Sequence, residues 1–297
     1  MTHRAPPSQF ASIPSLPTHP SEDLFQTSEG APFLGYRLLT RYPNLTHGVF
    51  TRIGGISSPP YDRLNVSYSV GDRPGAVSFN RNTIQKAIKA GRLVFMKQSH
   101  SDTIFVVRPQ HVQTNWVPPV ADAMITDVPQ VALLVKQADC QSVILFDPER
   151  QVVANVHCGW RGNVRNILEQ VVRRMNREFG SDPHHMAAAI GPSLGPCCAE
   201  FVNFQEYFPE SFRSFRVGPN RFDLWAVSRQ QLIRAGLTGH HIACARICTR
   251  CRTDLFYSYR AEGTTGRFGT VAMLNSDRGE DPTDPFTSMP APDLFLD

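Results

Sequence analysis

Short apolar runs recur along most of the chain and predict a protein rich in buried strands. Each run is too short for a helix that is buried on every side, and Gly, Pro, Asn or Asp residues separate the runs. Runs of this kind are typical of strands that are covered on both faces. Strands are predicted at 33–39, 46–52, 103–107, 131–135, 143–146, 152–156, 186–190, 242–247, 255–259 and 270–274. The short segments 94–96 and 121–126 each precede one of these strands.

Three segments instead have the spacing of amphipathic helices, at 78–90, 163–175 and 222–235. In the central one, apolar residues recur at three- and four-residue intervals from Ile167 to Met175, and Asn163 is the predicted N-cap. Helices alternate with strands without a repeated unit, and no linker divides the middle of the chain. The pattern predicts an α/β fold, a single-domain layered sandwich with mixed β-sheets.

The two ends of the chain lack this periodicity. Residues 1–30 are rich in Pro, Ser and Thr, and we expect a flexible N-terminal tail. Residues 276–297 are rich in Asp and Pro and are expected to form a C-terminal tail. The predicted domain therefore covers residues 31–275.

Composition narrows the classes of function. The 297 residues are 41% hydrophobic and 19% charged, as in ordinary soluble enzymes. The net charge of +4 is spread along the chain, which argues against a nucleic-acid or membrane-surface role. No apolar run is long enough to span a membrane, and the first residues lack the apolar core of a signal peptide. Seven Cys without a disulfide-scaffold spacing favour a reducing, cytoplasmic setting.

Three residues are candidate metal ligands. Cys140 lies between two buried runs and His157 ends the next run, so both can lie at strand ends, and His100 lies in the segment before the strand at 103–107. Two imidazoles and one thiolate leave one tetrahedral position open, as catalytic zinc requires. Their spacing also permits the plainer interpretation that the three residues are unrelated and that Cys140 is buried in the core.

The other cysteines are weaker candidates for metal ligands. Cys158 follows His157 directly, and because side chains alternate along a strand, it is expected to fill the core instead of reaching the same metal. Asp139 is either a support for the site or a hydrogen-bonded turn residue. Cys248 and Cys251 form a C-x-x-C motif that could make a structural zinc knot with Cys197 and Cys198. Adjacent cysteines chelate a tetrahedral ion poorly, so packed thiols are the favoured interpretation.

Arg161 and the start of the central helix predict an anion site beside these ligands. Unpaired N–H groups at a helix N-terminus attract anions, and a guanidinium can bind phosphate with two parallel hydrogen bonds. An alternative is that Arg161 packs over Trp160 or pairs with a carboxylate. A metal, an imidazole and an anion pocket together suggest a reaction that uses phosphate.

Several motifs resemble one known family in the correct order over roughly residues 33–275. They are His47-Gly48-Val49-Phe50-Thr51-Arg52 with Gly54-Gly55, Gln98-x-His100, Ala121-Asp122-Ala123 with Thr126, Ala138-Asp139-Cys140, His157-x-Gly159-Trp160-Arg161-Gly162, Ile190-Gly191-Pro192 with Gly195-Pro196-Cys197-Cys198, and Cys248-Thr249. The chain resembles the purine nucleoside phosphorylase family formerly described as laccase-domain or multicopper polyphenol oxidase proteins (YfiH-like). It departs from the family pattern at Cys158, where a small residue is usual, and at Ser142, where Pro is common.

The resemblance implies a layered α/β sandwich and a zinc-dependent enzyme. Such an enzyme would cleave adenosine, inosine, guanosine and methylthioadenosine with phosphate, and would also deaminate adenosine. The family's metal ligands correspond to His100, Cys140 and His157. Arg161 and Arg52, the latter in the matched N-terminal block, are the candidate phosphate ligands, although Arg52 could equally be a surface residue.

Two other chemistries compete with this prediction. A multicopper oxidase needs many His residues, commonly in His-x-His pairs, and the ten His of this chain include no such pair. One Cys and two His could nevertheless bind copper through its high intrinsic affinity. A cysteine hydrolase would use Cys140 as the nucleophile and a His as the base. A non-enzymatic binding protein would leave the convergence of His, Cys and Arg unexplained.

Overall fold

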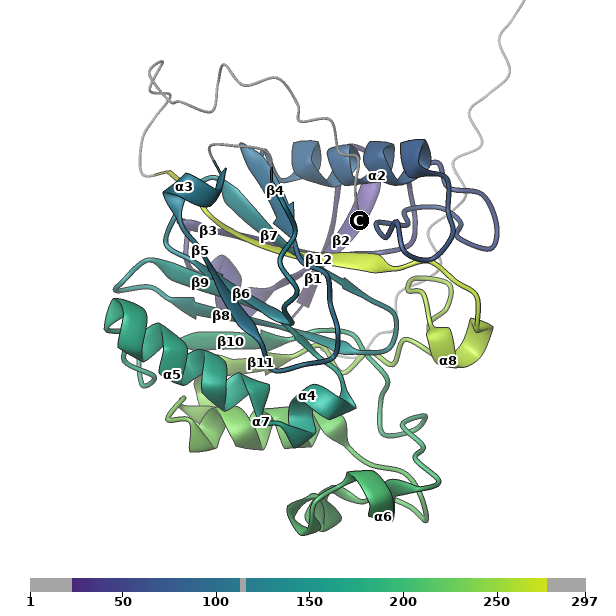
Figure 1. Ribbon diagram of the computed structural model, residues 1–297, viewed down its shortest axis with the longest axis vertical. Helices are drawn as coiled ribbons and strands as arrows, with labels where there is room; N and C mark the ends of the chain where they lie inside the picture. The colour runs from purple at the N-terminus through teal and green to yellow at the C-terminus, as the bar shows by residue number, and fades with distance from the viewer. Residues whose placement is uncertain (1–22, 113–115, 277–297) are drawn as a thin grey trace, which may run out of the picture.

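Two mixed sheets of six strands each pack face to face, with helices on both outer faces (Figure 1). The computed structural model describes residues 23–112 and 116–276, so residues 1–22 and 277–297 of the predicted tails lie outside it. The first sheet has the order β1 (Asp23–Ser28), β2 (Ala31–Tyr36), β3 (Leu45–Phe50), β12 (Phe268–Leu274), β7 (Val131–Gln137) and β4 (Arg92–Phe95). The second has the order β11 (Ile242–Cys244), β10 (Ala187–Ile190), β8 (Gln141–Asp147), β9 (Val152–Cys158), β6 (Ala123–Thr126) and β5 (Ile104–Val107).

Most neighbouring strands are antiparallel, and the parallel pairs lie at sheet edges, one pair in the first sheet and two in the second. In the first sheet this pair is β4 and β7, and in the second sheet β5 pairs with β6 and β10 with β11 in parallel. The helical segments are α1 (Arg37–Thr40), α2 (Pro74–Ala87), α3 (Pro109–Val112), α4 (Trp160–Val164), α5 (Ile167–Phe179), α6 (Phe204–Tyr207), η1 (Glu210–Phe215), α7 (Leu224–Arg234), η2 (Gly239–His241) and α8 (Tyr259–Glu262). The mixed-sheet sandwich predicted from the sequence is confirmed.

The strand alternation sorts apolar side chains into three layers. Leu133 of β7 and Ile144 of β8 belong to the core between the sheets. Leu134 faces α2 on one outer side, whereas Leu145 faces α5 and α7 on the other. Helices cover both outer faces, which explains why the strands appear in the sequence as continuous apolar runs.

One polar side chain joins the two sheets inside the core. Asn155 of β9 donates hydrogen bonds to the carbonyl oxygens of Leu133 and Thr270, at 2.8 and 2.9 Å. Its position follows from the period of two, because Asn155 and His157 face inward while Val156 and Cys158 face the helices. The first sheet thus supports the strand that carries His157.

Three local predictions are corrected. The predicted central helix is two helices, because Asn166 adopts a left-handed conformation with φ 55°. Asn163 lies inside α4 instead of capping it, and Gly159 is the N-cap. The predicted strand at 255–259 is an irregular buried segment that leads into α8, and its main-chain bonds go to separate loops, such as that from Arg52 N–H to the Leu255 carbonyl.

Two boundaries also differ from the prediction. The first strand among the described residues, β1, lies within the predicted N-terminal tail of residues 1–30. This strand pairs with β2 through main-chain hydrogen bonds, for which no apolar pattern is needed. The strand predicted at 33–39 ends at Tyr36, where the short helix α1 begins.

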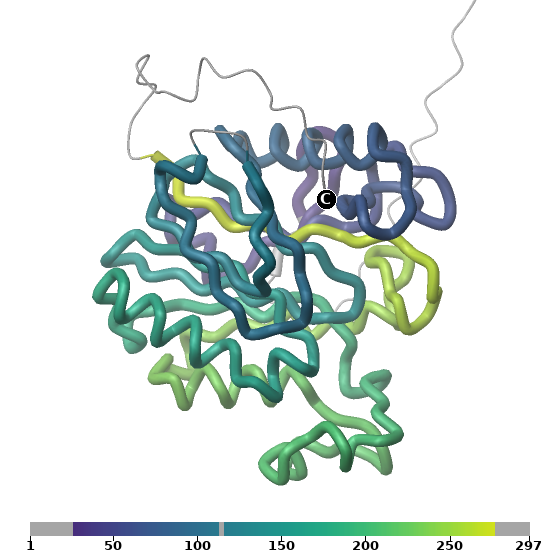
Figure 2. Tube along the Cα trace, viewed as in Figure 1, coloured from purple at the N-terminus to yellow at the C-terminus, as the bar shows by residue number. Residues whose placement is uncertain are grey.

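Between β10 and α7 the chain leaves the sandwich and forms a projection that contains α6 and η1 (Figure 2). A separate aromatic cluster fills this projection and includes Phe204, Phe212 and Phe222. Trp160 of α4 packs against its edge, with ring centroids 5.2 Å from Tyr207 and 5.9 Å from Phe208. The projection is therefore attached to the segment that follows His157.

Candidate metal centre

His157 is positioned by the end of β9. It pairs with Ser142 in the register of β8 and β9, and its own N–H donates to the Asp122 carbonyl at 2.7 Å. Its side chain is only 4% exposed and faces the space between the sheets. Cys158 faces the opposite way and belongs to the core beneath α5, so the predicted division between these two neighbours is confirmed.

Cys140 lies in the tight turn between β7 and β8. The preceding residue, Asp139, has a left-handed backbone with φ 82°. Its carboxylate accepts hydrogen bonds from the Thr249 and Ser258 hydroxyls, both at 2.7 Å, and from the Arg260 N–H at 2.6 Å. Of the two roles considered for Asp139, the structure supports the hydrogen-bonded turn residue. These bonds fix the turn that presents the Cys140 thiol.

His100 lies in the loop between β4 and β5 and also has a left-handed backbone, with φ 59°. This conformation is unusual for a side chain with a Cβ and requires support from neighbouring groups. The His100 N–H donates to Asp122 at 3.0 Å, and the Arg165 guanidinium donates to the His100 carbonyl. The loop is thus anchored on both sides of its imidazole.

These three residues converge as the sequence predicted. Cys140 Sγ lies 3.9 Å from His100 Nε2, and the two imidazole centroids are 4.9 Å apart. One donor atom from each residue lies within 4.8 Å of the others. Gly159 permits this approach, because a Cβ there would stand 2.8 Å from Cys140 Sγ. Soft thiolate and imidazole donors in such an arrangement fit zinc.

Asp122 is the central supporting residue, a role that could not be predicted from its place in the sequence. Its buried carboxylate accepts a 2.8 Å hydrogen bond from His157 Nδ1–H and further bonds from Ser99, His100 and Ser101. This bond leaves Nε2 of His157 available to a metal and makes it a better donor. The signal in the sequence was an ionisable residue between Ala121 and Ala123 in an otherwise apolar strand.

Neighbouring charges and hydrogen bonds shift the pKa values of three groups in the site. Burial alone would raise the pKa of Asp122, but the hydrogen bond and charge of His157 hold it well below its usual range. Burial would likewise raise the pKa of the Cys140 thiol, yet the nearby His157 and His100 lower it to about 6. Burial would lower the pKa of His157, whereas Cys140 and Asp122 raise it to about 9. The site therefore favours a thiolate beside a positive charge, which a metal ion can supply.

The three ligand residues open onto a cavity of about 1210 Å³. Aromatic residues line part of its wall, among them Trp160, Phe201, Tyr207 and Tyr259. The cationic residues along the wall are Lys97, Lys136, Arg161, Arg260 and Arg267, whereas Asp139 is the single carboxylate among its described lining residues. Such a cavity is suited to a flat apolar group together with an anion.

The two predicted phosphate ligands have different positions. Arg161 lines the cavity from α4, with its guanidinium carbon 4.3 Å above the Trp160 ring. Arg52 lies outside the cavity lining and is held by Glu262 at 2.7 Å and by the carbonyls of Asp62 and Thr253. The structure thus does not bring Arg52 to the site. The long helix α5 begins at Ile167, so α4, with five residues, contributes little helix dipole.

Known proteins resemble this chain over most of its length. A family model described as multi-copper polyphenol oxidoreductase laccase matches residues 46–275. A Bacteroides thetaiotaomicron protein named purine nucleoside phosphorylase is 31% identical over 259 residues, which are 82% of this chain and 96% of that protein. A Streptomyces coelicolor protein with the same enzyme name is 36% identical over 244 residues, covering 78% of this chain and 97% of its own length.

Solved structures share the fold as well. The structure of the hypothetical protein YfiH from Bacillus licheniformis has a TM-score of 0.76 and 28% identity, and it covers 84% of this chain and 99% of its own. The structure of YlmD from Geobacillus stearothermophilus has a TM-score of 0.74 and 29% identity, covering 86% of this chain and 100% of its own. No helix in the two described ranges, 23–112 and 116–276, is long and apolar enough to cross a membrane.

Proposed function

Because this chain belongs to the family described as multi-copper polyphenol oxidoreductase laccase, whose curated relatives are named purine nucleoside phosphorylases, we propose that it is a zinc-dependent enzyme of that kind. Its substrates would be adenosine, inosine, guanosine and methylthioadenosine with phosphate, and it would also deaminate adenosine. The observation that carries this proposal is the convergence of His100, Cys140 and His157 at a cavity with aromatic and cationic walls.

His100, Cys140 and His157 would hold the zinc, and Asp122 would orient His157. Bound zinc supplies a Lewis acid with an open position for an oxygen ligand. The buried carboxylate of Asp122 keeps the Nδ1 proton on His157, so Nε2 would be the atom that binds the metal. Left-handed backbone at His100 and Asp139 places both loops before any ligand arrives, which reduces the reorganisation that binding requires.

Phosphate would bind among the cationic residues of the cavity, with Arg161 as its bidentate partner. In phosphorolysis a phosphate oxygen forms a bond to the ribose C1′, while the bond from C1′ to the purine nitrogen breaks and the base leaves with that electron pair. The sugar becomes cation-like as this bond lengthens, so an anion held at C1′ stabilises the transition state. Arg161 and the other cations position that anion against the sugar.

The purine would lie against the aromatic part of the wall. Trp160, Phe201 and Tyr207 lie together there, with the Trp160 centroid 5.2 Å from that of Tyr207 and 6.3 Å from that of Phe201. Stacking on aromatic rings does not depend strongly on the substituents of the base, which supports a broad range of purine nucleosides. The size of the cavity also accommodates a nucleoside and phosphate together.

The competing chemistries have less support. Of the two groups of metal-binding side chains that the described residues form, one contains two His and the other none. His47, in the matched N-terminal block, accepts a hydrogen bond from the Tyr36 N–H and is buried away from both. A multicopper centre needs more His ligands than this. A cysteine hydrolase would use the low-pKa thiol of Cys140, but that thiol lies within metal-ligand reach of two imidazoles.

Metal analysis combined with a phosphate-dependence assay on adenosine tests the proposal. Protein expressed without added copper should contain zinc, and release of free adenine should require phosphate. Stoichiometric copper without zinc would contradict the metal assignment. Base release that is independent of phosphate would instead identify a hydrolase, and formation of inosine reports deamination separately.

A further inference from the structure

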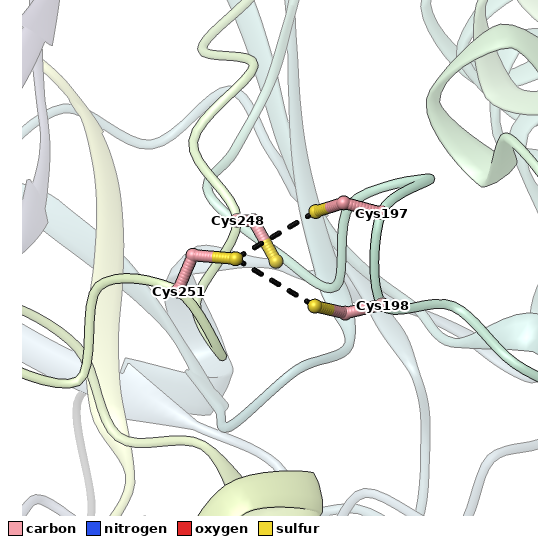
Figure 3. A group of neighbouring side chains, drawn as sticks. All are labelled: Cys197, Cys198, Cys248 and Cys251. Carbon is pink, nitrogen blue, oxygen red and sulfur yellow. Dashed lines mark hydrogen bonds between the residues drawn. The ribbon is translucent and has the colours of Figure 1, made fainter.

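A second group of metal-binding side chains lies away from the cavity ligands. Cys197 and Cys198 come from the segment after β10, and Cys248 and Cys251 come from the segment after β11 (Figure 3). All four sulfur atoms lie within 4.8 Å of one another. We propose that these four cysteines bind a second zinc ion in a closed tetrathiolate site. This inference does not depend on the proposed enzymatic activity.

The sulfur distances match a tetrahedral ion. Cys251 Sγ is 3.7 Å from Cys197 Sγ and 3.6 Å from Cys198 Sγ. Four sulfurs at about 2.3 Å from zinc in a tetrahedron lie about 3.8 Å from each other. A disulfide would bring two sulfurs to about 2.05 Å, so these contacts are not disulfides. The two separations from Cys251 thus match those that zinc requires, and the remaining sulfur pairs lie within 4.8 Å.

The backbone conformation allows two adjacent cysteines to face the same ion, which adjacent residues in a strand cannot do. Cys197 and Cys198 lie in a turn, in which the Cys198 and Ala199 N–H groups both donate to the Gly195 carbonyl at 2.8 Å. Adjacent side chains diverge in a strand, but in this turn both sulfurs point toward Cys251 (Figure 3). Cys248 and Cys251 have the C-x-x-C spacing that is common in structural zinc sites.

The surroundings favour a metal over packed thiols. Cys197 and Cys251 are exposed, so burial of apolar surface does not explain why they converge. The Gly195 N–H donates to Cys248 Sγ at 3.3 Å, which stabilises charge on that sulfur. A zinc ion with four thiolates carries a net charge of about −2. Arg250 lies within the C-x-x-C segment, and Arg221 donates to the Cys197 carbonyl.

The proposed ion would join the two segments that form one wall of the cavity. The first segment continues to Phe201 and Tyr207, and the second to Arg260, all of which line the cavity. Thr249 lies between the two cysteines of the C-x-x-C motif and donates to Asp139, the neighbour of Cys140. The second zinc would therefore support the cavity wall and the turn that carries a ligand of the first site.

Zinc counting on the full-length chain tests the proposal. We expect about two ions per chain in the unaltered protein and about one in Cys197→Ala/Cys251→Ala. These two side chains are exposed, so their removal leaves the core intact. Cys244→Ala is the matched control, because Cys244 lies in β11 outside both groups, and it should retain both ions.

The Cys140→Ala variant separates this proposal from the proposed function. It should retain one ion, which the additional replacement of Cys197 and Cys251 should remove. If the first site holds no zinc, the unaltered chain will contain one ion that Cys140→Ala keeps. The second site is refuted if Cys140→Ala contains no zinc, or if Cys197→Ala/Cys251→Ala has as much zinc as the unaltered chain. Iron in place of zinc would also overturn the assignment.

Alkylation of the unaltered protein gives a readout that does not require a variant to fold. At about pH 8.5, the ordinary pKa of a cysteine thiol, exposed thiols react readily. We expect Cys197 and Cys251 to resist alkylation until a strong chelator is added, although both are exposed. Equal labelling with and without the chelator would contradict the proposal, as would a disulfide between any two of the four residues.

Discussion

The two thiol-containing groups are built differently, although their donor atoms are equally close together. The group of His100, Cys140 and His157 lies at strand ends and an adjoining loop, is supported by a buried carboxylate and opens onto a large cavity. The group of four cysteines lies on two surface segments and has two exposed members. Three protein donors leave a position for a reactant, whereas four donors close the coordination sphere. This difference supports the two proposals, in which the first group serves chemistry and the second serves architecture.

Removal of the Cys140 thiol should produce the largest effect on activity. We expect Cys140→Ala to reduce phosphorolysis by about 10³-fold or more, equivalent to about 4 kcal/mol, with little change in melting temperature. Cys158→Ala is the control, because its side chain faces the helix layer and should leave most activity intact. Equal losses in the two variants, or full activity in Cys140→Ala, would contradict the assignment of the first group.

Replacement of Asp122 tests whether a carboxylate behind the ligands distinguishes the first group. Asp122→Asn retains the shape of the side chain but is a poorer acceptor for His157 Nδ1–H. We expect zinc to bind this site about 100-fold more weakly. Asp139→Asn should chiefly lower the melting temperature, since Asp139 holds the segments near the second group. Competition with a zinc-binding dye measures the zinc affinity of Asp122→Asn. An unchanged affinity would show that the carboxylate behind the ligands does not distinguish the first group from the second.

Arg161→Lys tests whether Arg161 binds phosphate in the cavity next to the first group. The charge is retained, but the planar two-pronged contact with phosphate is lost. We expect normal zinc content, a higher phosphate KM and a loss of roughly 10–100-fold in phosphorolysis, or about 1.4–2.7 kcal/mol. Deamination needs no phosphate and should change less.

The contact between Arg161 and the Trp160 ring suggests an alternative role for Arg161, in which it stabilises α4 and does not bind phosphate. If the guanidinium only stabilises α4, both activities and the melting temperature should fall together, and the phosphate KM should not move. Measurement of the two activities and the melting temperature on this one variant separates the alternatives.

The smallest expected effect concerns thiol reactivity after zinc removal. Alkylation of Cys140 should increase as the pH rises through about 6, because His157 and His100 stabilise its thiolate. At pH 7 a low-pKa thiolate is also less nucleophilic, and Cys140 should exceed an ordinary thiol by only about a few-fold. A Cys140 profile centred near pH 8.5, about the ordinary pKa of a cysteine thiol, would show that the imidazoles do not stabilise the thiolate.

The sequence predicted those parts of the site that depend on local periodicity. Alternation along β9 was enough to place His157 on the inner face and Cys158 on the helix face. Asp122 was missed because its contact with His157 depends on the register between β6 and β9, which neither strand encodes alone. The convergence of the four cysteines was not predicted, because it depends on a turn at Cys197 that brings two adjacent side chains together.

The errors in the predicted fold also arise from features that no local sequence pattern encodes. Leu255, Phe256 and Tyr257 are buried and match the composition of a strand, yet no neighbouring strand pairs with them within the described residues. The break between α4 and α5 depends on the backbone of Asn166, and the apolar spacing continues across it without interruption. Burial and periodicity could be predicted from the sequence, whereas pairing partners and single-residue backbone changes could not.

The position of β12 has a consequence for how the protein is made. This strand comes last among the described strands, yet it lies in the interior of the first sheet, between β3 and β7. During synthesis, β3 and β7 therefore emerge from the ribosome long before the strand that pairs with both of them. Their edges remain open during that interval, and such edges are prone to pair with other chains. Until β12 has been translated, the growing chain therefore carries two such edges, one on β3 and one on β7.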